Sequence, residues 1–110
     1  GLFHGKNITI VGDTEINGGI EITNGKLNTI HTAAIKAVFI NSEITSDVIV
    51  KKAQRCWRFL GATQPPPQIL ELKEKSIILG DITFEDPGEV HLFDASQVKG
   101  KVLNGKVIAK

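Results

Sequence analysis

Apolar and polar residues alternate along most of the chain with the two-residue period of β-strands. Residues 10–16, 44–50 and 78–84 all show this spacing, and Gly, Asn, Asp or Ser stands at the breaks. A helical repeat would need apolar residues at i, i+3, i+4 and i+7, which these segments lack. The pattern therefore predicts short strands, rich in Ile and Val, rather than a helical bundle.

The same segments are also internal repeats. Residues 10–16 match residues 44–50 and then residues 78–84, at an offset of 34 both times. Nearer the C-terminus, residues 70–82 match residues 90–102 at an offset of 20. Strands that recur about every 17–20 residues can all bury the same face if the chain coils into a parallel β-solenoid. In such a fold each turn, or rung, stacks on the last.

We therefore predict an all-β fold: a single-domain parallel β-helix (β-solenoid) over residues 1–110, with about 5–6 short rungs in residues 8–50 and 69–107. On this interpretation an offset of 34 is two rungs and an offset of 20 is one. An antiparallel barrel or sandwich remains the alternative, because hairpins also give regular spacing. The length of 110 residues leaves no room for a second domain.

The alternation assigns a set of apolar residues to the interior. Gly12, Ser46, Gly80 and Gly100 are expected at corners, where the chain turns tightly. We expect Val11, Ile49, Ile77, Leu79, Phe93 and Leu103 to point outward. The predicted interior comprises Ile8, Ile10, Ile16, Ile20, Ile22, Leu27, Ile35, Val38, Ile40, Ile44, Val48, Val50, Leu70, Leu72, Ile78, Ile82, Phe84, Val90, Leu92, Val98, Val102 and Val107.

Residues 51–68 do not follow the alternation and are predicted to be an insertion. A short helix over 51–60, ended by Gly61, fits the first part, and three consecutive prolines then favour an extended segment. The aromatic residues of this insertion suit a cover over outward apolar side chains. A contact surface for a partner, made of Arg55, Trp57, Arg58 and Phe59, is the functional alternative.

Residues that carry chemistry are sparse. Asp13, Asp47 and Asp81 recur in register, but at two rungs apart they would not meet at one bond or ion, so we interpret them as turn or solvated residues. The three histidines and Cys56 lack the spacing of a zinc site. Since no phosphate loop, dinucleotide fingerprint or nucleophile elbow is present, we predict no enzymatic activity, no catalytic or metal-binding residues and no cofactor.

Composition narrows the partners. A net charge of +1 argues against an electrostatic nucleic-acid binder, and no apolar run approaches a transmembrane segment. The chain has no Met, so Gly1 is interpreted as a trimmed start from which a signal peptide would already be missing. Both the bacterial cytoplasm and the cell envelope stay open as locations.

Residues 76–84 (Ser-Ile-Ile-Leu-Gly-Asp-Ile-Thr-Phe), followed by Val90, Leu92, Ser96, Val98 and Gly100-Lys101-Val102, resemble the rungs of bactofilins, the bacterial polymer-forming cytoskeletal proteins. The resemblance is looser over residues 8–50. It implies a right-handed β-helix that polymerises end to end without nucleotide. Bactofilin rungs run without a break, whereas the insertion at 51–68 interrupts these.

Two functions follow as hypotheses. The first is a non-enzymatic structural or scaffolding solenoid that self-associates through its terminal rungs, with Leu2, Phe3, Val107 and Ile108 as the candidate ends. The second is a cell-envelope binding or adhesion module that recognises glycan or protein through the Trp57 insertion and a solenoid face.

Overall fold

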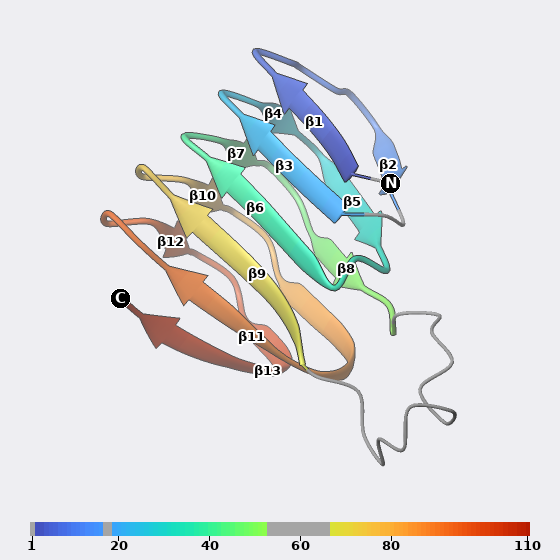
Figure 1. Ribbon diagram of the computed structural model, residues 1–110, viewed down its shortest axis with the longest axis vertical. Coiled ribbons are helices and arrows are strands. Elements are labelled where there is room, and N and C mark those ends of the chain that lie inside the picture. Colours follow the sequence, from blue (N-terminus) through green and yellow to red (C-terminus); the bar gives the residue numbers. More distant parts are fainter. Residues whose placement is uncertain (1, 17–18, 53–66) are drawn as a thin grey trace.

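The computed structural model describes residues 2–16, 19–52 and 67–110, with the side chains of Leu2 and Phe3 excepted, and every regular element in these ranges is a β-strand (Figure 1). In chain order the strands are β1 (Leu2–Lys6), β2 (Asp13–Ile16), β3 (Gly19–Thr23), β4 (Lys26–Leu27), β5 (Thr29–Thr32), β6 (Lys36–Ile40), β7 (Glu43–Ile44), β8 (Val48–Val50), β9 (Gln68–Lys73), β10 (Ile77–Ile78), β11 (Ile82–Leu92), β12 (Gln97–Val98) and β13 (Val102–Ala109).

The strands pair in parallel and form three faces of a β-solenoid of about five turns. The broad face holds β1, β3, β6, β9 and the C-terminal parts of β11 and β13, side by side at the front of Figure 1. The narrow face holds β4, β7, β10 and β12, and the Thr9–Lys26 bridge adds the first rung to it. The return face holds β2, β5, β8 and the N-terminal parts of β11 and β13. The predicted parallel solenoid is confirmed.

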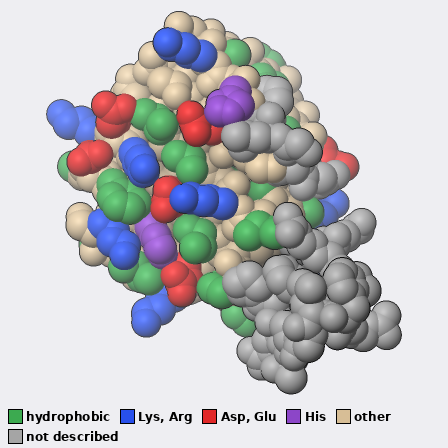
Figure 2. Space-filling model, in the orientation of Figure 1, with side chains coloured by type: hydrophobic (Ala, Val, Ile, Leu, Met, Phe, Trp, Pro, Cys, Tyr) green, Lys and Arg blue, Asp and Glu red, His purple; other side chains and the backbone are tan. Residues whose placement is uncertain are grey.

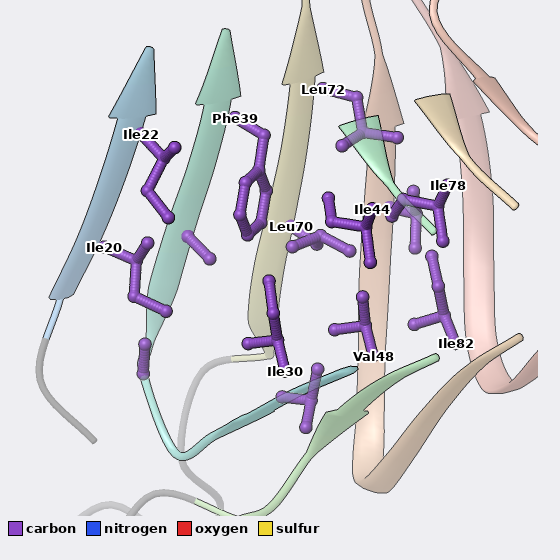
Figure 3. Packing of buried hydrophobic residues seen from close by; sticks show 14 of the residues in the cluster. Ile20, Ile22, Ile30, Phe39, Ile44, Val48, Leu70, Leu72, Ile78 and Ile82 are labelled. Atoms are coloured by element: carbon purple, nitrogen blue, oxygen red, sulfur yellow. The ribbon is translucent and has the colours of Figure 1, made fainter. Parts of the chain in front are cut away.

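The core is a set of columns that run along the solenoid axis. One column on the broad face passes through Ile20, Ala37, Leu70 and Val90, each at most 3% exposed. Parallel strands lie about 4.8 Å apart, so each side chain packs on its equivalents in the rungs before and after it. Figure 3 shows Ile20 and Leu70 of this column pointing into the space between the faces, where Ile30 and Ile44 also lie. The buried set is Ile20, Ile22, Leu27, Ile30, Ala34, Ala37, Phe39, Ile44, Val48, Val50, Leu70, Leu72, Ile78, Ile82, Phe84 and Val90.

The predicted interior is wrong in β6. Val38 and Ile40 were expected inside, but they lie on the outer side of the strand, and Ala37 and Phe39 are the buried residues. Ile35, also expected inside, is half-buried at the corner before β6. The registers Ile20–Ala37 and Ile22–Phe39 fix the phase of β6. Because residues 37–40 are all apolar, alternation alone does not set that phase.

The offset of 34 residues has two different meanings in the chain. Between Ile10 and Ile44 it spans two rungs, because Leu27 lies between them in the same column. Between Ile44 and Ile78 it spans a single rung, since these two residues are direct neighbours in register. The prediction that 34 always means two rungs is therefore wrong for the second pair. The offset of 20 is one rung, as predicted.

The difference arises at the insertion, which joins β8 to β9 at the corner between the return and broad faces. Three residues link Thr32 to Lys36 in the preceding turn, whereas the equivalent passage from Val50 to Ile69 is much longer. Gln68, placed in the insertion by the sequence, is instead the buried first residue of β9. Of the helix predicted over 51–60, residues 53–60 lie outside the described ranges.

Gln68 closes the base of the insertion. Its side-chain Nε2 donates hydrogen bonds to the carbonyl oxygens of Ala34 (2.9 Å) and Lys51 (2.7 Å). The Lys51 amide in turn donates to Thr32 O (2.7 Å), and the Ile69 amide donates to Ile35 O (2.9 Å). The ladder of hydrogen bonds is thus continuous up to Lys51, where the insertion begins, and resumes at Ile69, after it. The solenoid therefore does not need the insertion for its register.

We therefore expect a variant in which two alanines replace residues 51–67 to fold. The passage from Val50 to Ile69 then has the length of that from Thr32 to Lys36, and a shorter loop lowers the entropy cost of closure by roughly 1 kcal/mol. Circular dichroism should show an unchanged β spectrum and a thermal midpoint no lower than that of the full chain. Loss of a cooperative transition would show that the insertion is part of the fold.

Candidate functional site

Three columns of polar side chains run along the corners of the solenoid. The side chains in these columns form hydrogen bonds from rung to rung. The first is a buried serine column on the inner side of the corner between the broad and narrow faces. Each hydroxyl accepts the amide of the preceding rung: Gly25 N–H donates to Ser42 Oγ, Ser42 N–H to Ser76 Oγ, and Ser76 N–H to Ser96 Oγ, each at 3.0 Å. These hydroxyls satisfy buried backbone groups and hold the rungs in register.

The second column is an exposed asparagine ladder at the same corner. Asn41 Nδ2 donates to Asn24 Oδ1 (2.7 Å), and Asn24 Nδ2 donates to Asn7 Oδ1 (3.0 Å). All three residues have a left-handed backbone, with φ between 48° and 55°, which asparagine tolerates better than most side chains. In the next two rungs the corner uses two left-handed residues instead, first Glu74 with Lys75 and then Asp94 with Ala95.

The third column contains two of the repeated aspartates, at the corner between the narrow and return faces. Asp47 Oδ1 accepts the amide of Asp81 (2.9 Å), and Asp81 Oδ1 accepts the amide of Lys101 (2.8 Å). Asp47 and Asp81 therefore lie one rung apart and not two, which corrects the spacing expected from the sequence. Their carboxylates join consecutive rungs. Asp13 stands farther along the column, with Thr29 of β5 between it and Asp47.

Gly80 and Gly100 make this third column possible. A Cβ at Gly80 would overlap Ser46 O and the Asp47 carboxylate, and a Cβ at Gly100 would overlap Gly80 O and the Asp81 carboxylate. The predicted corner role of these residues is therefore explained by close approach of the backbone of the preceding rung. A side chain at either position would push the carboxylate away from the amide that it accepts.

Each of the three histidines lies beside an acidic side chain rather than in a cluster. His4 Nδ1 is 3.7 Å from Glu21, His31 Nε2 is 3.8 Å from Asp13, and His91 Nε2 is 2.9 Å from Glu89. Within the described ranges no three His, Cys, Asp or Glu side chains come together in a way that would hold a metal ion. The described residues also include no helix of the length and hydropathy needed to cross a membrane.

The outer side of the broad face mixes charges with apolar side chains, as Figure 2 shows. Glu71 lies between two lysines, with Lys36 Nζ at 3.8 Å and Lys73 Nζ at 3.7 Å, and Lys73 also lies 5.3 Å from the centre of the Phe93 ring. The Glu71 side chain is only 13% exposed, whereas those of Lys36 and Lys73 are 58% and 39% exposed. The ion pairs of this face join residues of the same sheet to one another.

The contact surface predicted at Arg55, Trp57, Arg58 and Phe59 lies outside the described residues. The predicted outward residues, in contrast, are confirmed: Val11, Leu79 and Leu103 are exposed, at 86%, 42% and 47%, and Ile49, Ile77 and Phe93 are half-buried. Ile77 and Leu79 flank Ile78 on the narrow face, whereas Ile49 and Leu103 lie on the return face.

The two ends of the solenoid expose residues of the core columns. Val107 in β13 is 47% exposed, whereas its neighbour in the same column, Val90, is fully buried. Val98 and Val102 are likewise only partly buried, although Ile78 and Ile82 beside them are fully buried. At the other end Ile8, Ile10 and Ile16 are also only partly buried. In the described ranges the strands at both ends pair on one side only, which leaves backbone groups open.

The four predicted end residues are thus placed differently. Val107 belongs to an exposed core column, as the interface hypothesis requires, whereas Ile108 lies on the outer side of the broad face opposite His91. Leu2 and Phe3 lie in β1, opposite Gly19 and Ile20 of β3, and their side chains lie outside the described part.

Sequence reasoning missed Ile8, Ile10, Val98 and Val102 as end residues, and it missed the basic character of the C-terminal end. Residues 95–110 contain Lys99, Lys101, Lys106 and Lys110 and no acidic residue. The first rung carries Asp13 and Glu15 on β2. The sequence does contain this signal, as a run of lysines without an acidic residue. Such a run can be assigned to one end of the solenoid only when the order of the rungs is known.

In comparisons with family models, curated proteins and solved structures, no match to this chain was found.

We expect Ser76→Ala to lower the free energy of unfolding by about 1–3 kcal/mol, because it leaves the buried Ser42 amide without its acceptor. Ser46→Ala, at a half-buried corner of the same rung as Ser42, should change it by less than about 0.5 kcal/mol. Urea denaturation of both variants measures the difference. Equal losses would show that the Ser42 amide finds another partner.

Proposed function

We propose that this protein is a non-enzymatic structural module whose solenoids associate end to end. The observation that carries the proposal is the partial exposure of the core columns at both ends, seen most clearly at Val107. An open end of this kind combines apolar side chains with unpaired strand edges, and a second solenoid supplies both kinds of partner. The residues proposed to act are those of the first and last rungs.

The polar residues support a structural rather than a catalytic role. The Asp47 and Asp81 carboxylates and the hydroxyls of Ser42, Ser76 and Ser96 accept backbone amides from neighbouring rungs. A carboxylate that accepts a backbone amide in a ladder is held in place by the fold. The polar side chains whose hydrogen bonds repeat from rung to rung thus stabilise the regular stacking of the rungs.

The resemblance of residues 76–102 to bactofilin rungs is consistent with this proposal. It adds a bacterial, polymer-forming, cytoskeleton-like role to the interpretation. The insertion does not interrupt the register of the rungs, because Ile44–Ile78 and Val48–Ile82 are direct neighbours. The break in the repeat, which set this chain apart from bactofilins, is therefore a break in the sequence and not in the ladder.

Size-exclusion chromatography with light scattering, over a concentration series of residues 1–110, tests the proposal. We expect the mass to rise with concentration, and negative-stain images of the heaviest fraction to show elongated particles. A strict monomer at every concentration would contradict end-to-end association.

A charge at the exposed end should weaken this association. We expect Val107→Glu to raise the concentration needed for assembly at least tenfold, because the glutamate would be buried at the contact. Leu79→Glu is the matched control, since Leu79 is similarly exposed (42% against 47%) but points outward from β10's rung, which lies between the rungs of β7 and β12. Equal effects of the two substitutions would place the contact elsewhere.

A further inference from the structure

The three faces of the solenoid do not have equal numbers of strands. Within the described residues the broad face has six, from β1 to residues 105–109 of β13. The return face has five, and the narrow face has four strands and the Thr9 bridge. The last strand of the broad face therefore stands one rung beyond the last strands of the other two faces.

Because of this extra strand, two copies cannot stack with all three faces in contact at once. If β1 of one copy paired with residues 105–109 of another, the narrow and return faces of the two copies would be separated by about two strand spacings, or ~10 Å. Val98 of one copy would then face a gap where Ile10 of the next should pack. Val102 would face the same gap in front of Thr14. Such a contact would leave apolar residues of both ends exposed.

We propose that residues 105–109 of one copy displace β1 of the next and pair in parallel with its β3. This inference rests on the proposed end-to-end association and says how the two ends fit. With β1 removed from the sheet, each copy has five rungs on every face of its described part, the Thr9 bridge counting as the first rung of the narrow face. The narrow and return faces then meet at one strand spacing, and the ladder of hydrogen bonds continues from copy to copy.

The register of the existing columns fits this exchange. The column of Ile20, Ala37, Leu70 and Val90 ends at Val107, so Val107 would pack on Ile20 of the next copy. Ala109 follows in the column that contains Ile22 and Leu72. Both residues keep the inward phase that they have in their own solenoid.

The charges also fit. The exchange places Ile108 opposite Glu21 of the next copy, with Lys106 and Lys110 as the two diagonal neighbours of that carboxylate. On the return face, Lys101 would stand opposite Asp13 of the next copy, because both belong to the same column. Two basic C-terminal ends meeting each other would instead bring like charges together, and direct stacking would bring Lys110 against Lys6.

The displaced strand has a single sheet neighbour. Within the described residues β1 is an end strand that pairs with β3 alone, and the ion pair between His4 and Glu21 is long and exposed. The cost of releasing β1 is offset, because residues 105–109 restore the hydrogen bonds on the edge of β3 and pair their own open edge in the same step.

A disulfide that ties β1 to β3 tests the exchange. In a Cys56→Ser background, His4→Cys with Glu21→Cys places two thiols at neighbouring positions in register, within disulfide reach. We expect oxidation to raise the concentration needed for assembly at least tenfold, and reduction to restore it. Lys26→Cys with Glu43→Cys is the matched control, because it ties β4 to β7 inside the solenoid, and its oxidation should change nothing.

A second pair of thiols reports the contact itself. Glu21→Cys with Ile108→Cys, again with Cys56→Ser, should give a ladder of disulfide-linked multimers on a non-reducing gel. Direct stacking leaves these two positions too far apart, and a contact between two C-terminal ends does not bring them together, so neither gives the ladder.

The outcomes separate the two proposals. If the oxidised lock assembles as well as its reduced form, or if the ladder is absent while the unmodified chain assembles, the exchange is wrong and end-to-end association stands. If the unmodified chain does not assemble, both proposals fail.

Discussion

The structure depends on one constraint, which is the parallel register of each rung with the rungs beside it. Backbone hydrogen bonds place equivalent residues about one strand spacing apart, so every inward side chain packs on its equivalents and every corner repeats the corner before it. The serine, asparagine and aspartate columns all follow from this register, since each needs a partner one rung away in the same direction. The core is therefore a set of parallel columns rather than a cluster around a centre.

Register also explains how much of the fold the sequence predicts. Alternation with β-branched residues indicates strands, and in-register matches such as Ile78 with Val98 indicate coiling, so the parallel solenoid was predictable. Residues 37–40 were not, because alternation has no phase in a segment that is apolar on both sides. A spacing of 17 residues would have given that phase, since it relates Ile20 to Ala37 and Ile22 to Phe39.

The candidate site was predictable only in part. Val107 belongs to a column that alternation identifies, and its position at an end follows from the order of the rungs. The extra strand of the broad face at this end follows from the number of strands in each face. The sequence does not reveal that number, because the offset of 34 between Ile44 and Ile78 has the length of two rungs but spans one. The same spacing covers two rungs before Ile44 and one rung after it, because the insertion contains almost as many residues as a turn. No local pattern distinguishes the two cases.

The insertion also bears on how the molecule folds. Most pairs of neighbouring strands are 16–20 residues apart along the chain, but strands of the third and fourth rungs are 33 or 34 residues apart. A longer loop costs more entropy to close, so a turn should form more readily on either side of this junction than across it. Since each rung touches only its neighbours, stability is close to a sum over adjacent pairs. Residues 2–50 and 68–109 are then two nuclei that grow by local steps, and their docking is the slow event in folding.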